Sequence, residues 1–237
     1  MRIRLSCSLL VGTRGGPGVA GGRRDVGVTD RVAVWRAVHE ERRRLIRDLT
    51  GLAPDQWRTP SLCPGWSVHD VLAHLIDAAT TTRLGFARQL LAARFDFDRA
   101  NEHGVLRHRA DDPAATLEAF GAVVDRTDTP PGPLATRLVE AFVHGEDVRR
   151  PLGTTGDYPR EHVMTALAYV ARTSPGFGGG RERVHGLRLS PVDADGHLGD
   201  GPEVRGTALA LLLAASGRPL DEHELTGPGA QILLARA

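Results

Sequence analysis

Three side chains have the types and the spacing of a metal site. Glu140 and His144 stand four positions apart, which places them on one helical face, one turn apart, where a carboxylate and an imidazole can reach the same cation. His74 has apolar neighbours three or four positions away, so we expect it to point into the protein interior. Two histidine nitrogens and one carboxylate oxygen form a common catalytic zinc shell, with a position left open for water or substrate.

Each of these residues also has an ordinary structural explanation. A Glu-x-x-x-His pair is common on helix surfaces, and a histidine on an apolar face is often a hydrogen-bonded core residue. The ligand types leave the metal open as well, since manganese, iron or nickel can take the same ligands as zinc. The hypothesis is one divalent ion, most simply Zn²⁺, held by His74, Glu140 and His144.

The pattern of apolar residues and chain breakers predicts how these side chains are positioned. Ser67 stands three residues before Asp70, which approximates a helix-capping box and predicts that the helix bearing His74 starts at Val68. The segment Thr59-Pro-Ser-Leu-Cys-Pro-Gly-Trp66 before it is expected to be a shaped turn. Four helices and a polar, irregular segment at 96–112 are expected in residues 28–150: one after Thr29-Asp30 that ends at Gly51, and three at about 68–93, 114–125 and 134–148.

Residues 151–237 have a different pattern, which indicates a small α+β domain. Helices are expected at 161–173, 203–215 and 228–235, with a glycine-rich loop at 174–180, a strand at 184–192 and a possible short strand at 197–198. The expected fold class is therefore α+β, with a four-helix bundle first and the small domain second. The cleft between the two is where we expect a substrate to bind.

Residues 1–27 are rich in glycine and arginine, and we expect them to be a disordered extension, with a short secretion signal as the alternative. The net charge of +1 gives no reason to expect binding to nucleic acid or a membrane surface. No apolar run approaches the roughly 18 residues of a membrane span. Because the chain has only two cysteines, we expect no disulfide framework, and we expect a cytoplasmic location. A monomer or weak homodimer is expected.

Four further residues near the predicted ligands have open roles. Cys63 is either a reactive thiol or, more simply, a small buried residue. Asp70 and Asp77 flank His74 by one turn each, and Asp147 lies one turn after His144, so each could orient an imidazole. The alternatives for these acids are a helix cap or a salt bridge, for example to Arg149 or Arg150.

Two motifs resemble those of the mycothiol-dependent maleylpyruvate isomerase family, whose members are DinB-like helical bundles. The first is Leu62-Cys-Pro-Gly-Trp-Ser-Val-His-Asp-Val-Leu-Ala-His-Leu75, and the second is Glu140-Ala-Phe-Val-His-Gly-Glu-Asp-Val-Arg-Arg-Pro-Leu-Gly153. Segments at 95–101, 186–189, 201–206 and 217–219 are also similar to the family, the last three to its C-terminal domain, which resembles sterol carriers. The resemblance spans about residues 29–236 and implies that His74, Glu140 and His144 are the metal ligands.

The resemblance also implies a cofactor and a reaction. The cofactor is mycothiol, a thiol made by G+C-rich actinobacteria, and the arginine-only basic composition is typical of a G+C-rich genome. A metal-held thiolate would attack a small electrophilic substrate, either as an isomerase or as a thiol transferase. Two alternatives remain open: a small-molecule binding module in which the metal is structural, and a hydrolase in which the open metal position activates water.

Overall fold

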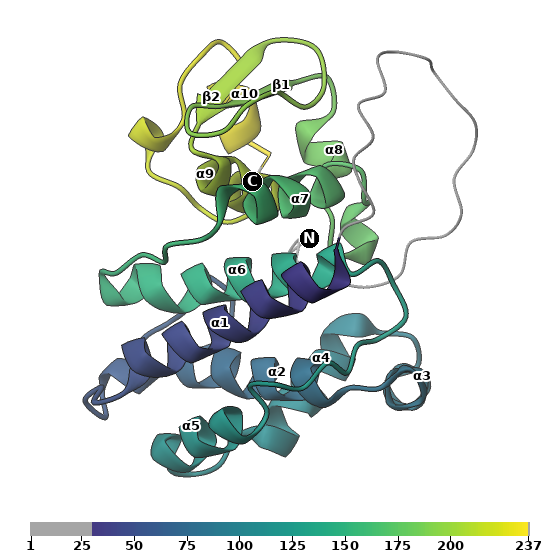
Figure 1. Ribbon diagram of the computed structural model, residues 1–237, viewed down its shortest axis with the longest axis vertical. Helices are drawn as coiled ribbons and strands as arrows, with labels where there is room; N and C mark the ends of the chain where they lie inside the picture. The colour runs from purple at the N-terminus through teal and green to yellow at the C-terminus, as the bar shows by residue number, and fades with distance from the viewer. Residues whose placement is uncertain (1–29, 237) are drawn as a thin grey trace.

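The computed structural model of the protein describes residues 30–236, so the extension predicted at 1–27 lies outside the described residues. The first part of the described chain is a helical bundle, as expected (Figure 1). The count of four helices is wrong, because this part contains six. They are α1 (Arg31–Leu49), α2 (Val68–Thr80), α3 (Arg83–Ala92), α4 (Phe97–His108), α5 (Pro113–Ala122) and α6 (Ala135–Arg149).

The long helix expected at 68–93 is interrupted by a run of three threonines. The hydroxyls of Thr80 and Thr81 donate hydrogen bonds to the carbonyls of Ile76 and Asp77 at 2.9 and 2.7 Å, and Thr81 is extended with ψ of 111°. Thr82 then caps α3 by accepting a hydrogen bond from the Gly85 amide. Threonine side chains compete for backbone groups in this way, which favours a helix end and a new start over one continuous helix.

The segment expected to be irregular at 96–112 contains α4. Asp96 caps its first turn by accepting from the Arg99 amide, and the last turn carries Arg107 and His108, which suit the negative end of the helix. Its buried face is small and includes Gly104 and Val105, so apolar periodicity gave no signal. The helix packs against α2 instead through polar contacts with Asp77.

The predicted helix starts are mostly confirmed. Asp30 caps α1, and Ser67 and Asp70 form the capping box at the start of α2, with both reciprocal hydrogen bonds present. Asp112 caps α5, whose first residue is Pro113. These short polar side chains accept hydrogen bonds from amides that have no partner within the helix.

The second part is the small α+β domain that was expected. It contains α7 (Arg160–Val170), α8 (Arg181–Val184), β1 (Arg188–Pro191), β2 (Glu203–Gly206), α9 (Ala208–Ala215) and α10 (Ala230–Leu234). Short 3-10 helices lie at 56–58 in the bundle and at 150–152, 175–177 and 222–224. β1 and β2 pair in parallel, with Leu189 opposite Val204. The candidate strand at 197–198 is reduced to an isolated bridge between Leu189 and Leu198.

One expected helix, at 203–215, begins as a strand. Residues 203–206 form β2, and Thr207 begins the helix by accepting a hydrogen bond from the Ala210 amide. Val204 and Gly206 are buried while Arg205 is exposed, which is the alternation of a strand. The apolar run of α9 concealed this boundary in the sequence.

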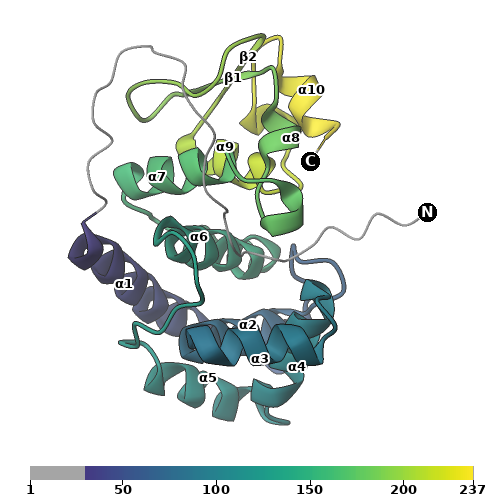
Figure 2. The ribbon, with the colours of Figure 1, turned by 90° about the vertical axis from the view of Figure 1, so that its right-hand side faces the viewer.

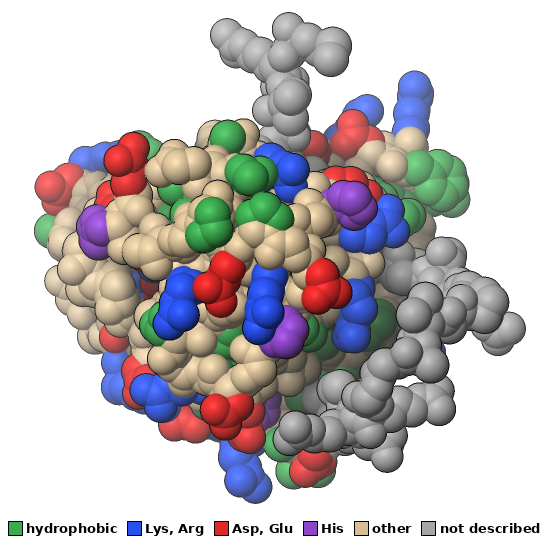
Figure 3. Space-filling model, turned by 90° about the horizontal axis from the view of Figure 1, so that it is seen from above, with side chains coloured by type: hydrophobic (Ala, Val, Ile, Leu, Met, Phe, Trp, Pro, Cys, Tyr) green, Lys and Arg blue, Asp and Glu red, His purple; other side chains and the backbone are tan. Residues whose placement is uncertain are grey.

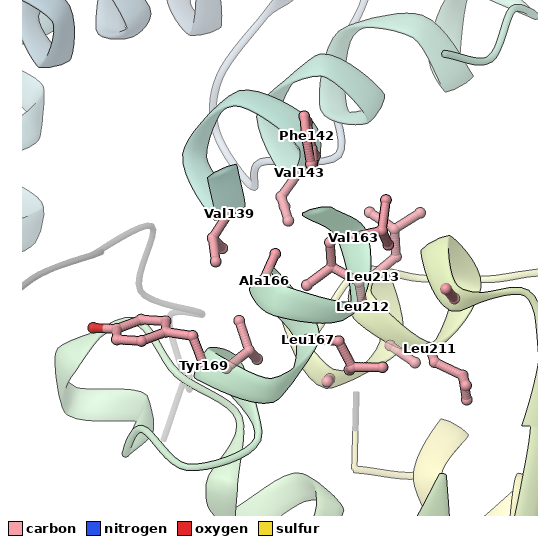
Figure 4. Close-up of a cluster of buried hydrophobic side chains, with 14 of the residues drawn as sticks. Val139, Phe142, Val143, Val163, Ala166, Leu167, Tyr169, Leu211, Leu212 and Leu213 are labelled. Carbon is pink, nitrogen blue, oxygen red and sulfur yellow. The ribbon is translucent and has the colours of Figure 1, made fainter. Parts of the chain in front are cut away.

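The bundle and the small domain share a hydrophobic core. Figure 4 shows side chains of α6, α7 and α9 packed together, among them Val139, Phe142, Ala166, Leu167 and Leu212. Figures 1 and 2 show α6 and α7 side by side at the junction, with α2 on the opposite side of α6. The helix that carries Glu140 and His144 is therefore covered from both parts, and all but one of its residues are buried.

None of the described helices is long and apolar enough to cross a membrane. Acidic and basic side chains alternate over the face of the small domain in Figure 3, with no large area of one sign. This surface fits the near-neutral charge of the sequence.

Candidate functional site

The turn before α2 brings the side chains of Cys63 and Trp66 close to the predicted metal ligands. Pro64 and Gly65 occupy its centre, and the Trp66 amide donates to the Cys63 carbonyl at 3.1 Å. Gly65 has φ of +84°, a value that glycine adopts without strain after a proline in a tight turn. The turn is joined to α6, because the Leu62 amide donates to the Asp147 carbonyl at 3.1 Å.

His74 and His144 meet inside the protein. Their ring centroids are 4.9 Å apart at an angle of 77°, and the Trp66 ring lies 5.1 Å from that of His74. Both histidines are buried, and His74 Nδ1 finds no hydrogen-bond partner among the described residues. A buried polar atom without a partner is costly, so this nitrogen is the strongest indication of a missing ligand.

Glu140 is buried one turn before His144 on α6, and its carboxylate is turned toward Arg137. Arg137 Nη2 lies 3.1 Å from Glu140 Oε2, and both side chains are nearly inaccessible to solvent. Because a guanidinium already neutralises this carboxylate, Glu140 is less closely associated with the two histidines than the prediction requires.

The tightest cluster of potential ligands in residues 30–236 is a different one. Cys63, His144 and Asp147 each offer an atom within 4.8 Å of the others, whereas the predicted trio does not meet this spacing. The cluster already contains a cation of the chain: Arg218 donates to both Asp147 oxygens, at 2.9 and 2.8 Å, and Arg218 Nη2 lies 3.3 Å from Cys63 Sγ. A metal at this position would face the guanidinium directly.

Cys63 and Asp147 approach the same nitrogen of His144. Asp147 Oδ2 lies 2.8 Å and Cys63 Sγ 3.7 Å from His144 Nδ1, and the thiol is 3.0 Å from Asp147 Oδ2. A Cys-His-Asp catalytic triad needs the thiol and the carboxylate on opposite ring nitrogens, so this arrangement is not one. Any metal bound by His144 would take Nε2, on the other edge of the ring.

The charges of this region follow from burial and from neighbours. Burial, helped by the nearby His144, lowers the pKa of His74 to about 4, so its imidazole is neutral at pH 7. Burial opposes a charge on His144, but Cys63 and Asp147 outweigh it and raise the pKa of that ring. Burial would raise the pKa of Asp147, but Arg218 and His144 hold it well below its usual range.

The structure distinguishes the three aspartates that could have oriented a histidine. Asp147 contacts His144 directly, and its cationic partner is Arg218 rather than Arg149 or Arg150. Asp70 belongs to the capping box and pairs with Arg109 at 2.8 Å. Asp77 pairs with Arg107 and His108 at 3.1 and 3.4 Å.

Arg149 and Arg150 belong to a separate ionic network. Arg149 is buried and donates to Glu41, Asp48 and the Tyr158 hydroxyl, at 2.5 to 2.7 Å. Arg150 contacts Glu146 and forms a two-bond fork with Glu224 of the small domain. This network stabilises the junction between the bundle and the small domain.

A cavity of about 370 Å³ lies at the junction, between α1, α7 and the start of α9. Its lining includes Arg44, Tyr158, Arg160, Asp193 and Thr207, and none of the predicted metal ligands. The expected cleft between the two parts is therefore present, but the structure does not connect it to His74 or His144.

The chain is similar to a known family model and to two solved structures. Residues 38–130 match the family model described as the mycothiol maleylpyruvate isomerase N-terminal domain. The chain thus resembles the mycothiol maleylpyruvate isomerase family. The match includes the Cys-Pro-Gly-Trp turn and His74 but ends before Glu140 and His144, so the full ligand set stays a prediction.

Solved structures support the same relationship at the level of the fold. Crystal structures of the mycothiol-dependent maleylpyruvate isomerase and of a histidine-to-alanine mutant are 18% and 17% identical to this chain, each with a TM-score of 0.57. Each match covers 86% of this chain and 94% of the solved chain, so the likeness in fold includes both the bundle and the small domain. No curated protein matches the sequence.

Sequence reasoning missed Arg218 as part of this site. The residue was noted only as part of a Gly217-Arg-Pro219 segment similar to the family, 71 positions from Asp147. A buried arginine has no periodic signature, so only the packing of the small domain on α6 reveals its contact.

Proposed function

We propose that this protein is a metal-dependent enzyme that uses mycothiol to act on a small electrophile, as an isomerase or as a thiol transferase. The single observation that carries the proposal is the buried pair of His74 and His144, with one imidazole nitrogen lacking a partner, in a domain that matches the mycothiol isomerase family.

The side chains of the predicted trio are of types that bind a divalent ion, although the structure does not gather their atoms within 4.8 Å. His74 Nδ1, His144 Nε2 and a Glu140 carboxylate oxygen would hold it, and such a shell leaves room for a further ligand. Glu140 would have to turn from Arg137, to which it is bound at 3.1 Å. When bound, the ion would supply charge that stabilises a thiolate at neutral pH.

Neighbouring side chains would position the two histidines. Asp147 holds the Nδ1 proton of His144 and so fixes the ring, while Trp66 packs beside His74. Cys63 is only 2% exposed and is hydrogen-bonded to Asp147, so it supports the site structurally and is a poor candidate for the attacking thiol.

The first test is metal content and thiol dependence. We expect about one zinc per chain, lost in His74→Ala, Glu140→Ala and His144→Ala, because three-ligand sites need every ligand. His69→Ala is the matched control, because it removes a buried histidine of the same helix as His74 whose partner is Thr116, and it should retain zinc. Zinc binding by all three ligand variants would contradict the site.

The second half of the test uses mycothiol and a panel of electrophiles that includes maleylpyruvate. Conversion should need both the metal and the thiol and should vanish in Glu140→Ala. Equal conversion without thiol would assign a hydrolase. Zinc and ligand binding without any turnover would assign a binding module.

A further inference from the structure

The small domain sends one charged side chain to the helix that bears His144. Arg218 follows the end of α9, where Gly217 adopts φ of +77° and the Arg218 amide donates to the Leu213 carbonyl at 2.9 Å. Its guanidinium reaches Asp147 of α6, and the residue as a whole is only 7% exposed. Nε and Nη2 then bind the two oxygens of Asp147 as a fork, at 2.9 and 2.8 Å.

This fork fixes the orientation of Asp147. A carboxylate that accepts from a planar guanidinium through both oxygens cannot rotate without losing a charged hydrogen bond. Asp147 is fully buried, so water cannot replace such a bond. Its Oδ2 is also the atom that accepts from His144 Nδ1 at 2.8 Å, so the fixed carboxylate holds the Nδ1 proton and with it the orientation of the ring.

We propose that Arg218 is a positioning residue of the metal site, which acts through Asp147 to hold the His144 ring with Nε2 directed to the metal. The inference rests on the proposed function and adds that the small domain completes the site within the bundle. Arg218 also lies 3.3 Å from Cys63 Sγ, so one guanidinium orders the turn, the acid and the histidine together.

A second charged fork across the same junction serves as the comparison. Arg150, which follows the last residue of α6, donates to both oxygens of Glu224 at 2.9 and 2.8 Å. This pair has the same chemistry and the same number of charged bonds as Arg218 with Asp147, but neither residue contacts a predicted ligand. Glu224→Ala therefore reports the loss of a junction fork alone, and Arg218→Ala should cost more stability because it leaves the fully buried Asp147 without its cation.

The experiment measures zinc affinity and the His144 proton in the full chain. Zinc affinity is obtained by competition with a chromophoric chelator, for the unmodified protein, Arg218→Ala, Arg218→Lys and Glu224→Ala. Changing groups that orient metal ligands costs about 10- to 100-fold in affinity, so we expect at least a tenfold loss in Arg218→Ala. The zinc affinity of Arg218→Lys should lie between those of Arg218→Ala and the unmodified protein, because an ammonium keeps the charge but cannot form the fork. Glu224→Ala should bind zinc as the unmodified protein does.

Long-range ¹H–¹⁵N NMR supplies a readout that a purely structural role would not change. The His144 signal, assigned with His144→Gln, should show a hydrogen-bonded, slowly exchanging Nδ1 proton in the unmodified protein and in Glu224→Ala, and a faster-exchanging one in Arg218→Ala. Equal zinc affinity and equal exchange of the Nδ1 proton in Arg218→Ala and Glu224→Ala would overturn the inference.

The two proposals fail separately. If the unmodified protein binds no zinc, the proposed function fails, and the NMR comparison in metal-free protein still decides whether Arg218 fixes the ring. If Arg218→Ala does not fold, Arg218→Lys keeps the charge and gives both measurements.

Discussion

At the scale of single residues, buried histidines of this chain have different partners and therefore different roles. His74 and His144 face each other, and Asp147 holds one nitrogen of His144. His69, on the same helix as His74, has an ordinary structural role instead, since its Nε2 lies 2.8 Å from the Thr116 hydroxyl. The partner of each imidazole, rather than its burial, separates a candidate ligand from a core residue.

His69 should make the folded state sensitive to acid. Burial, with a smaller contribution from Arg109, lowers its pKa below the ordinary 6.5, so the unfolded chain binds the proton more readily than the folded one. The stability that the neutral His69 contributes is therefore fully present above pH 6.5 and is lost as the pH falls through the pKa of the folded state. In urea unfolding at a series of pH values, His69→Gln should lose less stability below pH 6.5 than the unmodified protein.

The matched control for this prediction is His197→Gln, which changes an exposed histidine in the same way. Its pH dependence should follow that of the unmodified protein. An unchanged slope in His69→Gln would show that this histidine does not carry the acid sensitivity.

At the scale of elements, short polar side chains decide where the site helix begins. The Ser67 hydroxyl accepts from the Asp70 amide, and Asp70 Oδ2 accepts from the Ser67 amide at 2.9 Å. This box sets the start of α2 immediately after the Cys-Pro-Gly-Trp turn, and so sets the position of His74 relative to Trp66.

Ser67→Ala should destabilise the protein by about 1 kcal/mol, because the Asp70 amide loses its acceptor, while the bond from the Ser67 amide to Asp70 Oδ2 remains. Ser67→Thr keeps a hydroxyl at the cap and should stay close to the unmodified protein. Thermal unfolding of the three proteins measures the difference. Equal melting temperatures for Ser67→Ala and Ser67→Thr would contradict a stabilising cap.

At the scale of the whole molecule, the boundary predicted at residue 150 does not divide the core. One cluster of buried side chains includes residues of α1, α6, α7, β1 and α9, on both sides of that boundary. Two charged forks, Arg218 with Asp147 and Arg150 with Glu224, cross the same junction. We therefore expect the bundle and the small domain to unfold together.

Leu167→Ala tests this expectation. Leu167 is fully buried on α7, and its truncation should cost about 2–5 kcal/mol through lost burial and a cavity. All three tryptophans, Trp35, Trp57 and Trp66, lie in the bundle, so their fluorescence reports the part of the chain that does not carry the substitution. The fluorescence midpoint in urea should fall with that of circular dichroism.

Leu91→Ala is the control, because Leu91 is 66% exposed on α3 and its loss removes little packing. Two separate transitions, with the fluorescence midpoint unmoved by Leu167→Ala, would show that the two parts are independent units.

The sequence by itself determined the features that depend on near neighbours. Helical spacing placed Glu140 and His144 on one face, Ser67 and Asp70 gave the start of α2, and two local motifs gave the family resemblance. Where local signals conflicted, the prediction was wrong: the threonine run at 80–82 ended a helix that apolar spacing continued, and polar α4 carried no apolar stripe.

Only the tertiary structure decided which distant side chains share the site. Asp147, rather than Asp70 or Asp77, orients a predicted ligand, because the partners of each acid depend on helices that pack from elsewhere in the chain. Arg218 binds Asp147, which is 71 positions away in the sequence, and Arg137 forms an ion pair with Glu140. Contacts of this kind depend on how a buried charge finds its partner in the packed protein, and spacing along one helix contains no information about them.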